Sequence, residues 1–147
     1  LCFTLAITPL RVMAKLPELL RIRRMLGLFV YFYAVVHLLC YSWLDMGLEW
    51  MDIAIDIAKR PFILVGFTAF VLLTPLALTS FNRAIRMLGA KYWLRLHRAV
   101  YGVAVFAILH FYWMRSGKSN FAEVVLYGGI LAALLLWRVW NKRFARH

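Results

Sequence analysis

The chain has 147 residues, 65% of them hydrophobic, and its 18 Lys and Arg against 6 Asp and Glu give a formal net charge of +12. The apolar residues gather in runs of about twenty, which is typical of membrane helices and excludes an ordinary soluble domain. Basic residues flank these runs, so membrane topology explains the positive charge better than nucleic-acid binding does.

The hydrophobic runs predict an all-α integral membrane bundle. Leu1 to Leu10 is too short to cross a bilayer and has no basic segment before it, so we interpret it as the end of a truncated helix rather than a signal peptide. Complete spans are predicted at about residues 26–45, 62–80, 97–114 and 121–139. All four are expected to be helices, because backbone polar groups in hydrocarbon must be hydrogen-bonded within the segment.

The distribution of charge between alternate loops predicts the orientation. One set of loops and the tail contain most of the basic residues, namely Arg11, Lys15, Arg21, Arg23, Arg24, Arg83, Arg86, Lys91, Arg95, Arg98, Arg138, Lys142, Arg143 and Arg146. The opposite set contains Lys59, Arg60, Arg115 and Lys118 with Asp45, Glu49, Asp52, Asp56 and Glu123. By the positive-inside rule the first set, with the C-terminal tail, is cytoplasmic in a multi-pass protein.

Three of the four histidines lie within or at the ends of the predicted spans: His37 in the first, His97 and His110 in the third. Ionisable residues at membrane depth are functional candidates, although a neutral imidazole hydrogen-bonded to a neighbouring helix is an open alternative for each one. His147 lies in the basic tail, and no function is assigned to it. The first and third spans run in the same direction, so the depths of their residues can be compared.

Two levels of polar side chains result from this comparison. His37 and His110 both fall in the outer half of the membrane, while Arg23 and His97 lie 14 and 13 positions earlier, near the cytoplasmic edge. At 1.5 Å per residue the two levels are roughly 20 Å apart. This spacing suits haems near opposite membrane faces, with His37 and His110 as a bis-imidazole pair.

The inner level is less well determined than the outer one. Arg23 either pairs with a haem propionate or is a solvated basic residue, and the sequence leaves both interpretations open. Fourteen positions along a helix return to within about 40° of the same face, but thirteen leave His97 about 140° from His110. Gly27 and Gly102 would admit a macrocycle close to the backbone, although helix packing explains them better.

Two long segments carry a resemblance to a known family. They read RIRRMLGLFVYFYAVVHLLCY at 21–41 and LALTSFNRAIRMLGAKYWLRLHRAVYGVAVFAILHFYW at 76–113. The chain resembles the MsrQ family, formerly called YedZ, within the ferric reductase-like transmembrane group. The resemblance extends over residues 1–147, which it implies to be one haem-binding domain that lacks the first part of a bundle of about six helices.

The resemblance implies an electron-transfer subunit of the bacterial inner membrane. Family members take electrons from the quinone pool or reduced flavin and pass them through one or two haems b to a periplasmic molybdopterin-containing methionine sulfoxide reductase. The family's haem-associated residues fall on His37, His97, His110 and Arg23. The resemblance also implies FMN, for which the sequence offers no phosphate-binding glycine loop. No residue is expected to catalyse substrate chemistry.

Two alternative functions are open. One is a membrane reductase of the ferric-chelate or superoxide-generating kind, whose members usually add a cytoplasmic flavin and nicotinamide domain. The other is a non-redox membrane protein, such as a transporter, whose histidines are structural or relay protons. The acidic loop around Asp45, Glu49, Asp52 and Asp56 either docks a periplasmic partner or is simply solvated.

Overall fold

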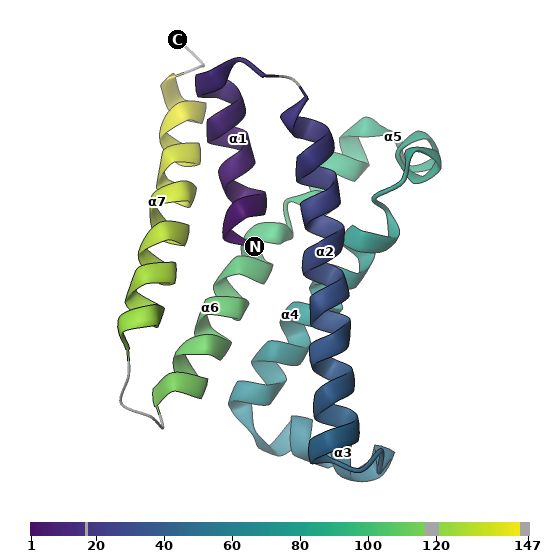
Figure 1. The fold of residues 1–147 in the computed structure, drawn as a ribbon. Helices are drawn as coiled ribbons and strands as arrows, with labels where there is room; N and C mark the ends of the chain where they lie inside the picture. Colours follow the sequence, from purple (N-terminus) through teal and green to yellow (C-terminus); the bar gives the residue numbers. More distant parts are fainter. Residues whose placement is uncertain (17, 117–120, 145–147) are drawn as a thin grey trace.

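The computed structural model describes residues 1–16, 18–116 and 121–144, with side chains as far as Asn141. In chain order its elements are α1 (Cys2–Ala14), α2 (Leu19–Cys40), η1 (Tyr41–Asp45), α3 (Trp50–Lys59), α4 (Pro61–Leu78), α5 (Asn82–His97), α6 (Val100–Ser116) and α7 (Ala122–Phe144). No strand occurs among the described residues, and the predicted all-α bundle is confirmed (Figure 1). The basic residues Lys118 and Arg146 and the tail residue His147 lie outside these residues, and so do the side chains of Lys142 and Arg143.

Four helical segments are long and apolar enough to cross a membrane. They are Leu19–Asp45, Pro61–Leu78, Asn82–Ser116 and Ala122–Asn141. Each overlaps one of the spans predicted from hydropathy, so the prediction of four complete spans is confirmed. The second begins at Pro61, because a proline costs no hydrogen bond at the first position of a helix.

The helices pack around α4 and α6, which form the most extensive pair in the bundle. α2 also packs on α4, and α1 lies between α2 and α7 (Figure 1). A buried cluster of Leu5, Ala104 and Leu131 joins α1, α6 and α7. The small side chain of Ala104 lets these three helices approach closely, as small residues commonly do in membrane bundles.

The outer surface of the bundle is apolar. Large hydrophobic side chains remain exposed along the spans, among them Phe32, Val71, Leu126 and Leu136. A continuous surface of this kind would be an aggregation hazard in water, whereas in a bilayer it contacts lipid. The chain is therefore a multi-pass membrane protein.

The third predicted span differs from the structure where it begins. We predicted a continuous helix over 97–114, but α5 ends at His97 and a turn at residues 98–99 separates it from α6. Three backbone hydrogen bonds of the 3₁₀ type form at this turn. The placement of His97 and His110 on one straight helix is therefore wrong, and the angle of about 140° expected between them does not apply.

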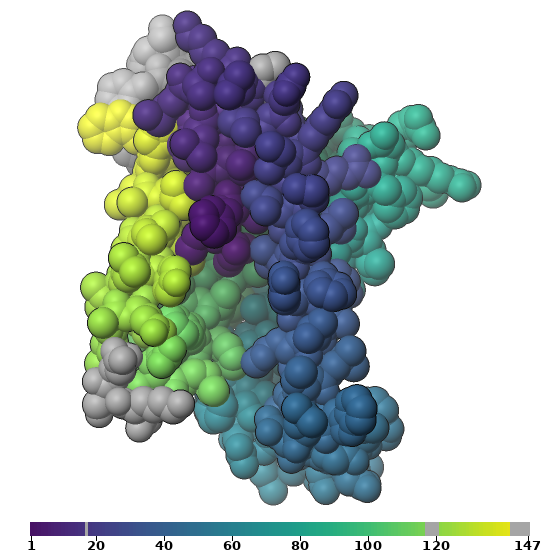
Figure 2. Space-filling model, viewed as in Figure 1, coloured from purple at the N-terminus to yellow at the C-terminus, as the bar shows by residue number. Residues whose placement is uncertain are grey.

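Helix α5 also bends within its own length. Gly89 adopts φ 73° and ψ 149°, a backbone conformation that side chains with a Cβ rarely adopt. The bend carries α5 away from the bundle, and Figure 2 shows it projecting beside α2. The bent α5 contacts the rest of the bundle near both of its ends: Arg24 donates a hydrogen bond of 2.8 Å to Asn82, and Trp93 donates one of 2.9 Å to the Thr79 carbonyl oxygen.

The charged residues are separated between the two ends of the bundle. We call one the acidic end; it contains α3, the C-terminal end of α6 and the N-terminal end of α7, and it carries Asp45, Glu49, Asp52, Asp56 and Glu123. The other, the basic end, contains the α1–α2 connection and the C-terminal half of α7, and it carries Arg11, Arg23, Arg98 and Arg138. The acidic end is at the bottom of Figure 1 and the basic end at the top.

Candidate functional site

His37 and His110 lie side by side in the half of the bundle nearer the acidic end. His37 is on α2 and His110 on α6, and both helices pack on α4. The centroids of the two imidazole rings are 6.3 Å apart, and the ring planes are inclined by 69°. The structure thus places together the two histidines that the sequence analysis assigned to one level.

Helix α4 fixes the orientation of the His110 ring. Its Nδ1 lies 2.7 Å from the carbonyl oxygen of Phe62, a distance at which Nδ1–H donates a hydrogen bond. The ring also lies against Gly66, where an added Cβ would be only 2.7 Å from Nδ1. With Nδ1 occupied by the backbone, Nε2 is the nitrogen left to bind a metal, and the hydrogen bond raises its basicity.

The spacing of the pair suits two imidazoles on opposite sides of one haem iron. A metal–imidazole bond is about 2 Å long, which puts each ring centre about 3 Å from the metal and two opposed ring centres about 6 Å apart. The 6.3 Å separation of His37 and His110 agrees with this. Both rings are only partly enclosed by protein, and haem iron accepts imidazole as an axial ligand. The two residues therefore fit a bis-histidine haem.

His97 has a different environment at the end of α5. Its Nε2 lies 3.1 Å from Thr79 Oγ1, and the ring of Trp93 stacks on its face at 3.9 Å between centroids. Trp93 in turn donates its indole N–H to the carbonyl oxygen of Thr79 over 2.9 Å. His97 is therefore fixed against the end of α4, and no second histidine faces it among the described residues.

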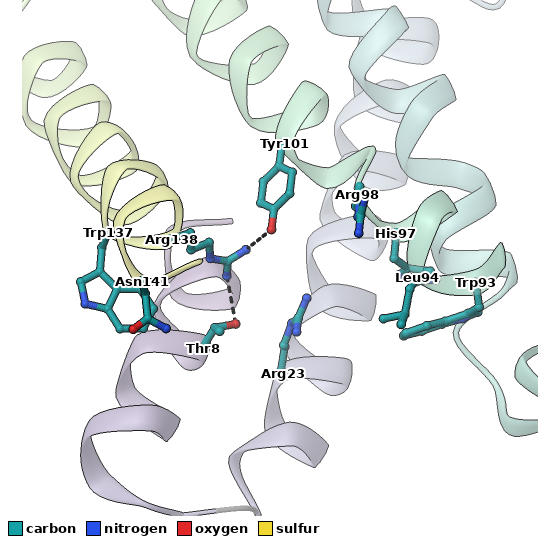
Figure 3. A pocket seen from close by; sticks show the side chains of 10 residues that line it. All are labelled: Thr8, Arg23, Trp93, Leu94, His97, Arg98, Tyr101, Trp137, Arg138 and Asn141. Atoms are coloured by element: carbon teal, nitrogen blue, oxygen red, sulfur yellow. Dashed lines mark hydrogen bonds between the residues drawn. The ribbon is translucent and has the colours of Figure 1, made fainter. Parts of the chain in front are cut away.

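Two adjoining cavities open beside His97 at the basic end. The larger has a volume of about 490 Å³ and is lined mainly by apolar side chains, including Leu73 and Leu76. The smaller, of about 310 Å³, is more polar and is drawn in Figure 3. Arg23, Trp93, Leu94 and His97 belong to the walls of both cavities. Volumes of this size are typical of cofactor sites.

The two residues predicted for the inner level, Arg23 and His97, line the same cavities, and no hydrogen bond joins them among the described contacts. Arg23 comes from α2 and His97 from α5, and both line the two cavities. Gly27 lies in the wall of the larger cavity, and a Cβ added there would be 4.0 Å from the side chain of Thr4. A Cβ added at Gly102 would instead meet the side chain of Leu72. Of the two glycines considered from the sequence, Gly27 is the one that belongs to the wall of these two cavities.

Several residues of the site are not apparent from the sequence. Gly66 makes the closest approach to a candidate ligand, yet it looks like any small residue in an apolar span. Thr79 and Trp93 surround His97 from the end of α4 and from α5. Arg138 lines the smaller cavity but was counted only as a basic residue at a membrane edge. Their roles depend on contacts between helices, which hydropathy does not reveal.

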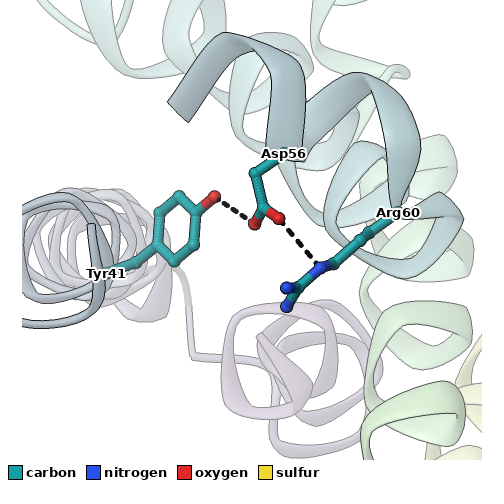
Figure 4. A network of polar contacts seen from close by, with 3 residues as sticks. All are labelled: Tyr41, Asp56 and Arg60. Atoms are coloured by element: carbon teal, nitrogen blue, oxygen red, sulfur yellow. Dashed lines mark hydrogen bonds and ion pairs between the residues drawn. The ribbon is translucent and has the colours of Figure 1, made fainter. Parts of the chain in front are cut away.

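A polar network lies one turn beyond His37 at the acidic end (Figure 4). Tyr41 donates a hydrogen bond of 2.8 Å to Asp56, which also forms an ion pair of 2.8 Å with Arg60. Tyr41 begins η1, a π-helical segment, and such segments are frequent beside functional sites. The network ties α3 to the end of α2, so the carboxylate of Asp56 is already paired within the chain.

Comparison with known proteins identifies the family. A family model described as "Ferric reductase like transmembrane component" matches residues 1–108. A methionine-sulfoxide reductase heme-binding subunit MsrQ from Polaromonas naphthalenivorans is 66% identical over 140 residues, which are 95% of this chain and 64% of the relative. The MsrQ of Bordetella pertussis is 51% identical over 148 residues, covering 99% of this chain and 71% of the relative. The chain belongs to the MsrQ family.

The other MsrQ relatives agree with this assignment. The protein from Herminiimonas arsenicoxydans carries the same name and is 51% identical over 146 residues, which are 97% of this chain and 67% of the relative. The chain therefore spans about two thirds of the length of the MsrQ proteins that it matches. No solved structure matches it. The resemblance noted in the sequence is confirmed: the chain belongs to a ferric reductase-like membrane family, and these relatives are named heme-binding subunits.

Proposed function

We propose that this chain is a haem b-containing electron-transfer subunit that supplies a periplasmic, molybdopterin-containing methionine sulfoxide reductase. It takes electrons from the quinone pool or from reduced flavin and passes them across the inner membrane, so that the partner can repair oxidised methionines in periplasmic proteins. The relatives' name, heme-binding subunit of protein-methionine-sulfoxide reductase, supports the cofactor and the system. The chain itself acts on no substrate.

The pairing of His37 with His110 is the observation that supports this function most directly. Haem b, when bound, supplies an iron that alternates between ferric and ferrous states. His37 on α2 and His110 on α6, whose ring centroids are 6.3 Å apart, would hold the haem iron. Two protein ligands leave no open position for oxygen or an iron chelate, which favours electron transfer over the ferric-chelate or oxidase alternatives.

Arg23 and His97 are our candidates for a second, inner site. They border the apolar cavity of about 490 Å³ at the basic end. The Nε2 of His97 contacts Thr79 at 3.1 Å, so ligation through this nitrogen requires that contact to break. Binding of a second haem therefore depends on whether His97 leaves Thr79. At the outer pair, the Nε2 atom of His110 can bind iron while Nδ1 keeps its hydrogen bond to Phe62.

We assign the basic end to the cytoplasm and the acidic end to the periplasm. The arginines Arg11, Arg23, Arg98 and Arg138 gather at one end of the bundle, and the positive-inside rule places such residues in the cytoplasm. The C-terminal tail then lies in the cytoplasm, with the donor on the same side for a soluble flavin or within the membrane for a quinone. His37 and His110 are then near the face at which the partner docks.

The acidic end offers the partner exposed carboxylates. Asp45, Glu49 and Asp52 are exposed, whereas Asp56 is occupied by Tyr41 and Arg60 (Figure 4). The sequence left open whether these four acidic residues dock a partner or are simply solvated, and three of them are exposed. Electrostatic steering by them would make association with the partner depend on ionic strength.

The functional test measures reduction of methionine sulfoxide by the purified partner reductase, with the full-length protein in vesicles as the electron source. We expect His37→Ala and His110→Ala to abolish partner reduction, because each removes one axial ligand. His147→Ala serves as the matched control and is expected to retain activity. Full activity in either of the first two variants would refute the assigned electron path.

A further inference from the structure

The smaller cavity at the basic end contains a buried cation without an acidic partner. Arg138 on α7 is only 7% exposed. Its guanidinium donates hydrogen bonds to the Leu5 carbonyl oxygen at 2.8 Å, to Thr8 Oγ1 at 3.0 Å and to the Tyr101 hydroxyl at 3.1 Å. All three acceptors are neutral, and the buried Nε–H of Arg138 has no acceptor among the residues that the structure describes. A buried charge normally has an ionic partner, so this one is incomplete.

Two further arginines line the same cavity. Arg23 comes from α2 and Arg98 from the turn after α5, so the three cations reach the cavity from three segments (Figure 3). Arg11 and Arg24 also lie in the wall of the adjoining larger cavity, which shares Arg23 with the smaller one. The described residues in the cavity wall include no Asp or Glu. Cations gathered in this way repel one another unless an anion lies between them.

The described ion pairs do not involve the arginines of this cavity. Asp56 pairs with Arg60, and Glu123 with Arg115, both at the acidic end. The chain's remaining acidic residue near the basic end is Glu18, which is exposed and belongs to neither cavity wall. No described carboxylate of the chain is therefore placed to neutralise Arg138, which points to a ligand as the source of the negative charge.

We propose that this cavity binds the carboxylate or phosphate group of an anionic ligand, with Arg138 as its buried anchor and Arg23 and Arg98 beside it. Guanidinium groups form paired hydrogen bonds to both kinds of oxyanion. The aromatic rings of Trp93, Tyr101 and Trp137 in the wall suit a ligand with a flat ring system. The inference rests on the proposed function, because it concerns a cofactor of the same electron path.

Two ligands of such a protein carry this chemistry. Haem has two propionate carboxylates, and the adjoining apolar cavity of about 490 Å³ shares His97 and Arg23 with the cationic one. FMN has a phosphate monoester, which riboflavin lacks. The two sources differ in what the arginines control, namely the reduction potential of a haem or the affinity for a flavin phosphate.

The test compares Arg138→Gln and Arg98→Gln with Arg86→Gln in the purified, haem-loaded full-length protein. Arg86 is an exposed arginine on α5 that belongs to neither cavity wall, so it controls for the loss of a positive charge. Each variant is titrated with FMN and with riboflavin, and the haem midpoint potentials are measured. Arg138→Gln removes a hydrogen bond to Leu5 on α1 and could therefore unfold the protein. Arg98 is exposed, so Arg98→Gln should leave the fold intact and decides the result in that case.

A phosphate site predicts that the wild type binds FMN at least about tenfold more tightly than riboflavin, and that both variants lose this preference. A propionate site predicts that one midpoint potential falls in both variants, because a nearby cation favours the ferrous state, while flavin binding equals that of the control. Flavin affinity and potentials that match Arg86→Gln in both variants would overturn the proposal. The haem held by His37 and His110 persists in that case, so the proposed function would stand.

Discussion

Gly66 determines how closely His110 can approach α4. The imidazole is held on one side by the Phe62 carbonyl oxygen at 2.7 Å and lies over the Cα of Gly66. Any side chain at position 66 must occupy the space of the ring, and the ring cannot withdraw without losing its hydrogen bond. A glycine in an apolar span thus controls the direction in which Nε2 of His110 points.

We therefore predict that Gly66→Ala displaces the His110 ring and lowers the haem content of the purified protein. The added Cβ would lie 2.7 Å from Nδ1, and overpacking of this kind costs about 1–3 kcal/mol. Gly102→Ala is the matched control, since its Cβ would meet Leu72 at an ordinary 3.9 Å. Pyridine-haemochrome analysis measures the content. Equal haem in both variants would show that Gly66 does not position the ligand.

Among individual residues, the sequence alone reveals those whose side chains are unusual at their depth in the membrane. His37 and His110 stand out because imidazoles are rare in hydrocarbon, and helical rise alone puts them at one depth. Gly66 and Arg138 do not stand out, because glycine is common in membrane helices and arginine is common at their cytoplasmic ends. Their importance comes from the neighbours that the fold brings to them.

The element that follows His37 is held in place by Tyr41 and Asp56. Their 2.8 Å hydrogen bond joins the π-helical end of α2 to α3, and the side chain of Asp56 is only 13% exposed. Arg60, by contrast, is 59% exposed, so solvent screens its ion pair with Asp56. The hydrogen bond, rather than the ion pair, should therefore account for most of the stability of this junction.

Tyr41→Phe is predicted to lower the free energy of unfolding by about 1 kcal/mol, because it leaves a partly buried carboxylate with one fewer donor. Arg60→Gln should change it by less than about 0.5 kcal/mol. Thermal unfolding in detergent, followed by circular dichroism, compares the two variants. A larger loss for Arg60→Gln than for Tyr41→Phe would mean that the ion pair holds α3 instead.

The boundary between α5 and α6 illustrates what hydropathy cannot predict. The turn at residues 98–99 contains neither Gly nor Pro, and the flanking segments are both good helix formers, so the pattern resembles one continuous helix. Gly89 is a recognisable breaker within α5, but its φ of 73° is settled only by how α5 leaves the bundle. The turn at residues 98–99 and the bend at Gly89 both change the position of His97 relative to His110, and therefore the geometry of the predicted inner site.

The whole molecule is polarised from a basic end to an acidic end, and this polarity is the basis of the proposed direction of electron flow. Hydropathy predicted the four spans and the all-α class because each membrane helix must satisfy its own backbone hydrogen bonds. The cavities beside His97 were not predictable, because six helices together contribute to their walls and none alone shows a concave surface. Loop charge did, however, place Arg11, Arg23, Arg98 and Arg138 in one group, and the structure brings these four residues to two adjoining cavities.

Orientation can be tested by cysteine labelling in intact spheroplasts. In a background with Cys2 and Cys40 replaced by alanine, Glu49→Cys should react with a membrane-impermeant maleimide, because Glu49 is exposed at the acidic end. Arg83→Cys, exposed on α5, should react only after the membrane is permeabilised. The reverse pattern would invert the proposed topology and place the outer histidine pair nearer the cytoplasm.

The most direct test of the account is the haem content of His37→Ala and His110→Ala. Dithionite-reduced minus oxidised spectra with pyridine-haemochrome quantification would be recorded on the purified full-length protein, with His97→Ala and the control His147→Ala beside them. We predict b-type bands in the wild type that fall in His37→Ala and His110→Ala, while the signal remaining in His97→Ala counts the haems. A colourless wild type, or full haem in both of the first two variants, would contradict the bis-histidine site.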